Sequence, residues 1–232
     1  MKQLIIAPIA IALLASSASA AVVATGTSST AQGTYNGTIS TTDLLAGTSP
    51  TVTGTFAGDT NGIYDGVTVD SNLTGTGGNI YLSSNPDVFM TFDLTGSVTG
   101  YDLTSIASIA GWNTNTQHHA AQFYEVLVSV VGSATYTSLN ITGAAASGGI
   151  VSYDPISSGP GSTRVEVTST TGVIASGVDS IRFRLISAPD GLDNDTVYKE
   201  IDVFGTATVV PEPSTALLGG LGVLALLRRR RH

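Results

Sequence analysis

The chain has 232 residues, enough for one domain with a packed core and additional segments at its ends. It contains no cysteine, which excludes disulfide bonds, thiolate chemistry and zinc sites built from cysteine. Residues 21–210 hold 4 of the 9 Lys and Arg residues and 16 of the 17 acidic residues, which gives them a formal charge of −12. A surface of this charge repels nucleic acid and anionic polymers at low salt, so we expect no nucleic-acid partner.

Residues 1–20 have the three parts of a secretory signal peptide. Lys2 supplies the positive charge, and residues 4–14 form an apolar run interrupted only by Pro8. Ala18, Ser19 and Ala20 then form the small-residue pattern of a cleavage site. The apolar run is too short to span a bilayer. We therefore expect export across the inner membrane and cleavage after Ala20.

Strand signals become regular after residue 50. Residues 21–50 are rich in Thr, Ser and Gly with weak periodicity, which indicates a leader or an edge strand. Further along, apolar residues alternate with polar ones at the period of two, or gather in β-branched runs. These segments are residues 88–94, 103–112, 123–131, 164–168, 181–185 and 197–206.

Turn-forming residues separate these segments, and none of the segments has the pattern of an amphipathic helix. Short strands at close spacing predict an all-β fold, an antiparallel β-sandwich, with a barrel as the main alternative. No motif repeats at a fixed period, which argues against a propeller or a solenoid. We place the sandwich domain at residues 51–208.

A series of short motifs extends over roughly residues 60–207. They are Ile63-Tyr64-Asp65-Gly66, residues 88–94 and 103–112, residues 124–129 with Gly132 and Tyr136 behind them, residues 180–185, and residues 198–205. Their order and spacing resemble the discoidin, or coagulation-factor C-type, family. That resemblance implies the galactose-binding-like jelly-roll fold.

The same resemblance implies a structural calcium ion beside the Asp-Gly turn. The matching ligands are Asp65, backbone carbonyls around Thr68 and Asp70, and Glu200 on the last strand. Calcium takes about six to eight oxygen ligands, so two carboxylates with carbonyls suit it. The alternative is that Asp65 caps the turn with Gly66 while Glu200 faces water.

A polar stretch begins with Trp112, the last residue of the second predicted strand, and also contains Asn113, Asn115 and His118. In the family that the chain resembles, ligands bind in loops at one end of the sandwich, often through an aromatic ring stacked on a sugar. Such a ring with polar neighbours suits a sugar, which has an apolar C–H face and a rim of hydroxyls. The resemblance implies a glycan site at these four residues, and the alternative is that Trp112 packs at the edge of the core.

The C-terminal residues 209–232 combine three features. Pro211, Glu212 and Pro213 precede an apolar run at residues 216–227, and Arg228, Arg229, Arg230 and Arg231 follow it. As a short helix this run would be about 18 Å long, against a hydrocarbon core of about 30 Å, which makes a poor permanent anchor. Together the three features resemble the PEP-CTERM sorting signals of exopolysaccharide-producing Gram-negative bacteria.

The PEP-CTERM resemblance implies processing near the Pro-Glu-Pro motif by an exosortase and transient anchoring in the inner membrane. The sequence has no Gly-x-Ser-x-Gly elbow, phosphate-binding glycine loop or His-Glu-x-x-His motif, so we expect no enzyme activity. We expect a secreted protein of the cell surface or extracellular matrix, whose sandwich binds a glycan such as exopolysaccharide. A structural or adhesive matrix protein without a small-molecule site is the alternative.

Overall fold

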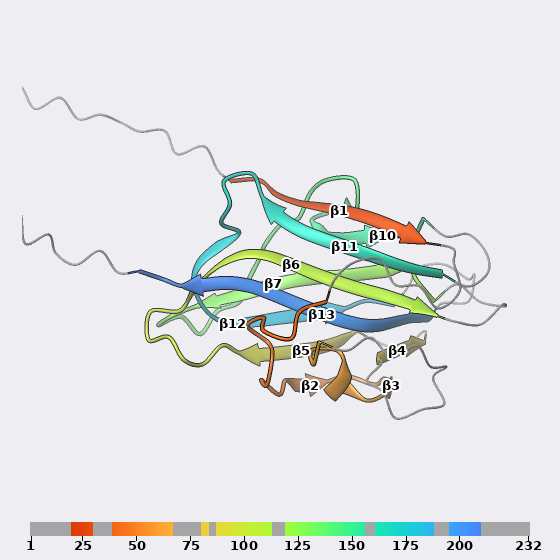
Figure 1. The fold of residues 1–232 in the computed structure, drawn as a ribbon, viewed down its shortest axis with the longest axis horizontal. Helices are drawn as coiled ribbons and strands as arrows, with labels where there is room; N and C mark the ends of the chain where they lie inside the picture. Colours follow the sequence, from red (N-terminus) through yellow and green to blue (C-terminus); the bar gives the residue numbers. More distant parts are fainter. Residues whose placement is uncertain are drawn as a thin grey trace, which may run out of the picture.

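The computed structural model describes residues 20–29, 39–66, 80–83, 87–112, 119–155, 161–187 and 195–209. They form an antiparallel β-sandwich, which confirms the predicted fold class (Figure 1). Among these residues no helix is long and apolar enough to span a membrane. The elements are β1 (Val22–Ser29), β2 (Thr51–Thr53), β3 (Ala57–Gly58), η1 (Thr60–Gly62), β4 (Ile80–Ser83), β5 (Val88–Asp93), β6 (Tyr101–Trp112), β7 (Gln122–Val130), β8 (Thr137–Ser138), β9 (Ala146–Ser147), β10 (Ile150–Tyr153), β11 (Gly161–Ser169), β12 (Ala175–Leu185) and β13 (Asp195–Ala207).

The strands form two layers. In one layer β3, β4, β13, β6, β11 and β1 are joined in that order. In the other, β2, β5, β12 and β7 are joined in order, β8 and β10 pair with β7, and β9 pairs with β10. The layers are connected at one corner, because the start of β12 also pairs with β6, at Ala175 with Leu103 and at Val178 with Tyr101.

Inward side chains of both layers form one hydrophobic core. Alternate residues of β5 and β12 are fully buried, as their spacing predicts, and these are Val88, Met90, Phe92, Ile181, Phe183 and Leu185. A series of edge-to-face ring contacts crosses the core, with centroids 5.5 to 6.2 Å apart. The rings belong to Tyr64, Phe92, Phe183, Tyr124 and Tyr198.

A polar cluster is buried within the core near the last part of β6. Gln122 Nε2 donates to the carbonyl of Thr163 at 3.1 Å and to its Oγ1 at 2.9 Å. Ser108 Oγ lies 2.5 Å from Gln122 Oε1 and 2.8 Å from the hydroxyl of Tyr124. Because buried polar groups with partners restrict their strands to one arrangement, this cluster fixes β6, β7 and β11 relative to one another.

The two ends of the described domain lie at the same end of the sandwich. β1 begins at Val22, beside the last residue of β11, and β13 ends at Ala207, beside the first residue of β6. Thr208 N then donates to the carbonyl of Gly100 at 2.9 Å. In Figure 1 this is the left end, where β1 starts and the β13 arrow points. The sorting signal therefore follows directly from this end.

The opposite end contains the last residue of β6 and the first residues of β11 and β13. Trp112 pairs with Gly161 there, and Asp195 pairs with Ser83. The segment 113–118, which contains most of the predicted glycan site, starts at this end and lies outside the described residues. Also outside them are Ala18 with the rest of residues 1–19, and residues 210–232 with the short hydrophobic helix expected there.

Candidate functional site

Glu200 of β13 is held beside the Asp-Gly turn. Its side chain is buried, and its Oε1 accepts a hydrogen bond from Gly66 N at 3.2 Å. The turn lies against the strand because Ile201 N donates to the carbonyl of Ile63 at 2.6 Å. Gly66 has a φ of +76°, and a Cβ on it would lie 2.6 Å from the carbonyl oxygen of Ser40, so the turn requires glycine.

Four carboxyl groups gather at this place, and we call Asp43, Asp65, Glu200 and Asp202 the acidic cluster. Burial raises the pKa of Glu200 to about 8, the Gly66 N–H lowers it, and the charges of the other three carboxylates raise it further. Burial also raises the pKa of Asp202 to about 6, and the charge of Asp43 adds to this shift. The pKa of Asp43 is raised by its own burial. Asp43, Glu200 and Asp202 therefore hold a proton more tightly than free carboxyl groups do.

Three carboxyl oxygens of the acidic cluster are buried without a hydrogen-bond partner among the described residues: Asp43 Oδ2, Glu200 Oε2 and Asp202 Oδ1. The second oxygens are bound, since Ser40 N donates to Asp202 Oδ2 at 3.2 Å and Leu45 N donates to Asp43 Oδ1 at 2.8 Å. A buried carboxylate oxygen without a partner is costly unless it is protonated or contacts a cation. Each of these three oxygens would be stabilised by a proton or by contact with a cation.

The predicted calcium ligands are only partly within the described residues. Asp65 is close enough to Glu200 for its charge to raise the pKa of Glu200, whereas Thr68 and Asp70 lie outside the described part. Among the described residues, no group of three or more His, Asp or Glu side chains could hold a metal ion by itself. A calcium ion at the Asp65 and Glu200 pair would thus need carbonyl oxygens as further ligands. Glu200 Oε2 fits such an ion, and the alternative in which Glu200 faces water is wrong, because this residue is 1% exposed.

The predicted glycan site is placed only by the strand that precedes it. Trp112 is the last residue of β6, while Asn113, Asn115 and His118 lie outside the described residues. The next residue, His119, is buried, and its carbonyl accepts a hydrogen bond from Val197 N at 3.0 Å. The site at these four residues therefore stays a prediction, located at the end of the sandwich opposite the sorting signal.

Asp43 and Asp202 are buried, although no motif in the sequence singles them out. Asp202 alternates with core residues of β13 and is covered because residues 40–45 run beside that strand. Val203 N donates to Asp43 Oδ1 at 3.3 Å, and Leu44 N donates to the carbonyl of Val203 at 2.8 Å. The one signal in the sequence is the Leu44-Leu45 pair within a polar segment, because such a pair indicates packing, and Leu45 is fully buried.

The C-terminal tail matches a known family model. Residues 209–231 match the PEP-CTERM protein-sorting motif. This match confirms the sorting signal inferred from Pro211, Glu212 and Pro213, the apolar run and the arginines. It covers the tail alone, and no curated protein matches the chain significantly.

Solved structures similar to the sandwich are F5/8 type C domains and carbohydrate-binding modules. One is the F5/8 type C domain of a Bacteroides fragilis protein, with 11% identity, 69% of this chain and 98% of that chain covered, and a TM-score of 0.39. A second is the module CpGH89CBM32-5 from Clostridium perfringens in complex with GalNAc-β-1,3-galactose, with 14% identity, coverage of 70% and 99%, and a TM-score of 0.40. A third is a mutant of the lectin binding domain of lectinolysin complexed with Lewis b, with 11% identity, coverage of 73% and 99%, and a TM-score of 0.43.

Proposed function

We propose that this chain is an exported protein of a Gram-negative cell surface or extracellular matrix, which an exosortase-type enzyme processes at its tail, and that its sandwich binds a glycan. The match of residues 209–231 to the PEP-CTERM motif supports the sorting part of the proposal. The sequence resemblance to discoidin domains and the aromatic residue at the end of β6 support the glycan-binding part. Exopolysaccharide is the candidate ligand.

The positions of the two ends of the sandwich are the observation that carries the proposal. The sorting signal follows β13 at the end that contains Ala207, and Trp112 lies at the opposite end. If the apolar run at residues 216–227 is held in the inner membrane, Trp112 would lie at the end of the sandwich farther from the start of the sorting signal. A glycan outside the membrane can then reach the proposed site without contacting the anchor.

We also propose that calcium is a structural ion at the acidic cluster. Asp65 and Glu200 would hold it, with backbone carbonyls around Thr68 and Asp70 as further ligands. A divalent cation there would offset the mutual repulsion of the four carboxylates and give Glu200 Oε2 a partner. The ion would thereby stabilise the turn against β13 and take no part in chemistry.

Glycan-array binding by the exported chain, residues 21–232, tests the proposed glycan site. We expect the wild-type protein to bind a subset of glycans, and Trp112→Ala and His118→Ala to lose that binding because the stacking ring or its polar neighbour is removed. Val98→Ala is the matched control, since Val98 is 94% exposed and lies in the turn between β5 and β6.

Two outcomes would contradict this proposal in different ways. Unchanged binding in both Trp112→Ala and His118→Ala would show that the glycan binds elsewhere. If the wild-type protein bound no glycan, including exopolysaccharide from the producing bacterium, the protein would be a structural or adhesive matrix component.

A further inference from the structure

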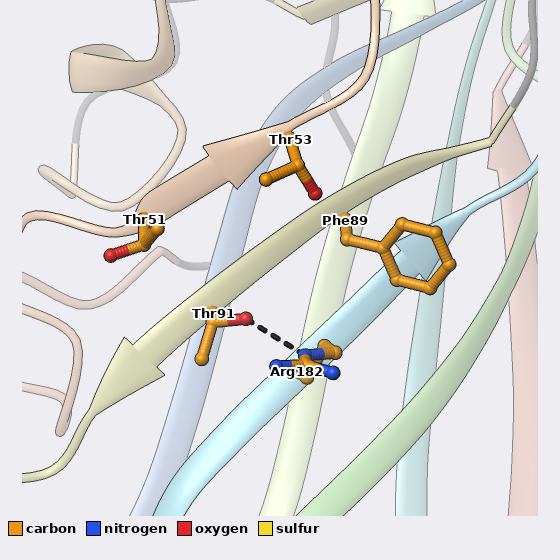
Figure 2. A pocket seen from close by; sticks show the side chains of 5 residues that line it. All are labelled: Thr51, Thr53, Phe89, Thr91 and Arg182. Atoms are coloured by element: carbon orange, nitrogen blue, oxygen red, sulfur yellow. Dashed lines mark hydrogen bonds between the residues drawn. The ribbon is translucent and has the colours of Figure 1, made fainter.

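The outer face of the second layer contains a groove of about 230 Å³. Its lining side chains come from three neighbouring strands, β2, β5 and β12, and are Thr51, Thr53, Phe89, Thr91 and Arg182 (Figure 2). The strand register explains why they share one face, since Thr91 is paired with Thr51 on one side and with Arg182 on the other. This groove lies on a sheet face in one layer, whereas Trp112 ends a strand of the other layer.

Arg182 is fixed in this groove by two contacts. Its Nε donates to Thr91 Oγ1 at 2.9 Å, and its Cζ lies 3.8 Å from the ring centroid of Tyr136. The hydroxyl of Tyr136 is in turn 2.7 Å from Ser180 Oγ, which holds the ring in place. Because the guanidinium is already held over the ring and by Thr91, it loses little further freedom when its terminal N–H groups bind another acceptor.

Arg182 differs from the next arginine on the same face of β12. Arg184 Nε lies 2.5 Å from Asp87 Oδ2, and its Nη1 lies 3.3 Å from Glu125 Oε2. Within the described part of the chain, no carboxylate forms such an ion pair with Arg182. The charge of Arg184 is thus balanced internally, whereas the charge of Arg182 has no acidic partner there, in a body whose formal charge is −12.

We propose that this groove binds a sugar residue that carries a carboxylate, such as a uronic acid set among neutral sugars. The terminal N–H groups of Arg182 match the two oxygens of a carboxylate. Phe89 offers an apolar surface for the C–H groups of the sugar, and the hydroxyls of Thr51 and Thr53 can bond its hydroxyls. That the ligand is a glycan rests on the proposed function, while the position of this second site does not.

The size and charge of the molecule restrict the ligand further. The volume of the groove is below about 300 Å³, the lower end of the range for pockets that hold a whole small molecule. We therefore expect it to hold one sugar unit of a longer chain. The net charge of residues 21–210 disfavours a polymer with a carboxylate on every unit, because long-range repulsion opposes its approach. Isolated carboxylates along a mainly neutral polysaccharide avoid this repulsion and still reach Arg182.

A matched pair of oligosaccharides tests the proposal. The probes are a xylo-oligosaccharide that carries one glucuronate and the same xylo-oligosaccharide without it, titrated into residues 21–232 by NMR or calorimetry. We expect the wild-type protein to prefer the glucuronate form by about tenfold or more, the size of one charge-assisted hydrogen-bond pair. Amide signals of Phe89 and Thr91 should shift with the acidic probe. Arg182→Met should remove the preference.

Two further variants keep the test independent of any folding defect. Arg184→Met removes an arginine from the same face of β12 and should keep the preference, because Arg184 is already paired. Thr53→Asp adds a negative charge at an exposed lining position and should weaken binding of the acidic probe more than binding of the neutral probe.

The outcomes separate this proposal from the proposed site at Trp112. A preference that disappears in Arg182→Met and Thr53→Asp but persists in Trp112→Ala supports the groove, whether or not the Trp112 site exists. If the wild-type protein showed no preference for glucuronate, or if Arg184→Met and Arg182→Met lowered it equally, the groove would not be a carboxylate site. A preference that depends on Trp112 alone would overturn the groove and support the other site.

Discussion

Strands β12 and β13 both alternate apolar and charged residues, yet their outward charged residues have different surroundings. The inward residues Phe183 and Ile201 are each fully buried in the shared core. On the outward side, Arg182 of β12 is half-buried beside an open groove, whereas Glu200 and Asp202 of β13 are buried.

A distant segment causes this difference. The turn at Gly66 donates to Glu200, and Ser40 N donates to Asp202, so residues 40–66 enclose the carboxyl groups of β13. The charged groups of β12 are contacted instead by side chains of the neighbouring strands, such as Thr91 and Glu125, which leave the sheet face accessible. Alternation therefore shows which residues face the core, but it does not show whether the other face is open.

The largest expected effect is on the core side, where the two strands should behave alike. Phe183→Ala and Ile201→Ala each leave a cavity in a fully packed interior, and we expect each to lower the free energy of unfolding by about 2 to 5 kcal/mol. Urea denaturation followed by circular dichroism measures this. A loss below about 1 kcal/mol in either variant would show that the two layers do not share one core.

The outward side of β13 should make the stability depend on pH. The pKa of Glu200 is raised to about 8 in the folded protein, above its ordinary 4.5, so the folded state keeps a proton that the unfolded state releases. The stabilisation from this proton is present at low pH and is lost as the pH rises toward 8. Without calcium, we expect the free energy of unfolding to fall by up to about 1.4 kcal/mol per pH unit between about pH 5 and 8.

Glu200→Gln and calcium sharpen this pH prediction. The amide in Glu200→Gln cannot ionise. With calcium removed by a chelator, the melting temperature of this variant should therefore depend less on pH between 5 and 8 than that of the wild type. Adding calcium to the wild type at pH 8 should raise its melting temperature, and the variant should respond less. If millimolar calcium left the wild-type melting temperature unchanged, the proposed ion would be wrong, while the pH profile would still test the burial of Glu200.

The smallest expected effect is on the outward side of β12. Arg184 is paired with Asp87 and Glu125, but its side chain is 40% exposed. Exposed ion pairs contribute about 0 to 1 kcal/mol, so Arg184→Met should change the free energy of unfolding by no more than this. A loss above about 2 kcal/mol would mean that the face of β12 is as enclosed as that of β13.

The long strands could be predicted from the sequence because their own residues alternate over a sufficient length. Segments at residues 88–94, 103–112, 123–131 and 197–206 correspond closely to β5, β6, β7 and β13, whereas 181–185 covers only the last part of β12. The short strands β2, β3, β8 and β9 have only two or three residues each, mostly Thr, Ser, Gly and Ala. Such segments are too short to show periodicity of their own. They become strands because they pair with the edge of a neighbouring strand.

Only part of the candidate sites could be predicted in the same way. The pairing of Asp65 with Glu200 came from the resemblance to discoidin domains, since nothing local in either segment indicates it. Asp43 and Val203 are 160 residues apart in sequence, and the groove at Arg182 depends on β2, a strand that the sequence did not reveal. Contacts of this kind are set by the register of the sheet, which alternation within one strand does not specify.

The described part of the sandwich holds the chain up to the start of the sorting motif. Thr208 N donates to the carbonyl of Gly100, Thr99 Oγ1 donates to the carbonyl of Thr208, and the sorting motif starts at the following residue. An extended chain advances at most about 3.6 Å per residue, so the three residues from Thr208 to the Pro-Glu-Pro motif span no more than about 11 Å of chain. If an exosortase-type enzyme cuts near that motif, as we propose, it would have to work close to the folded domain, on the side where the turn between β5 and β6 meets Thr208.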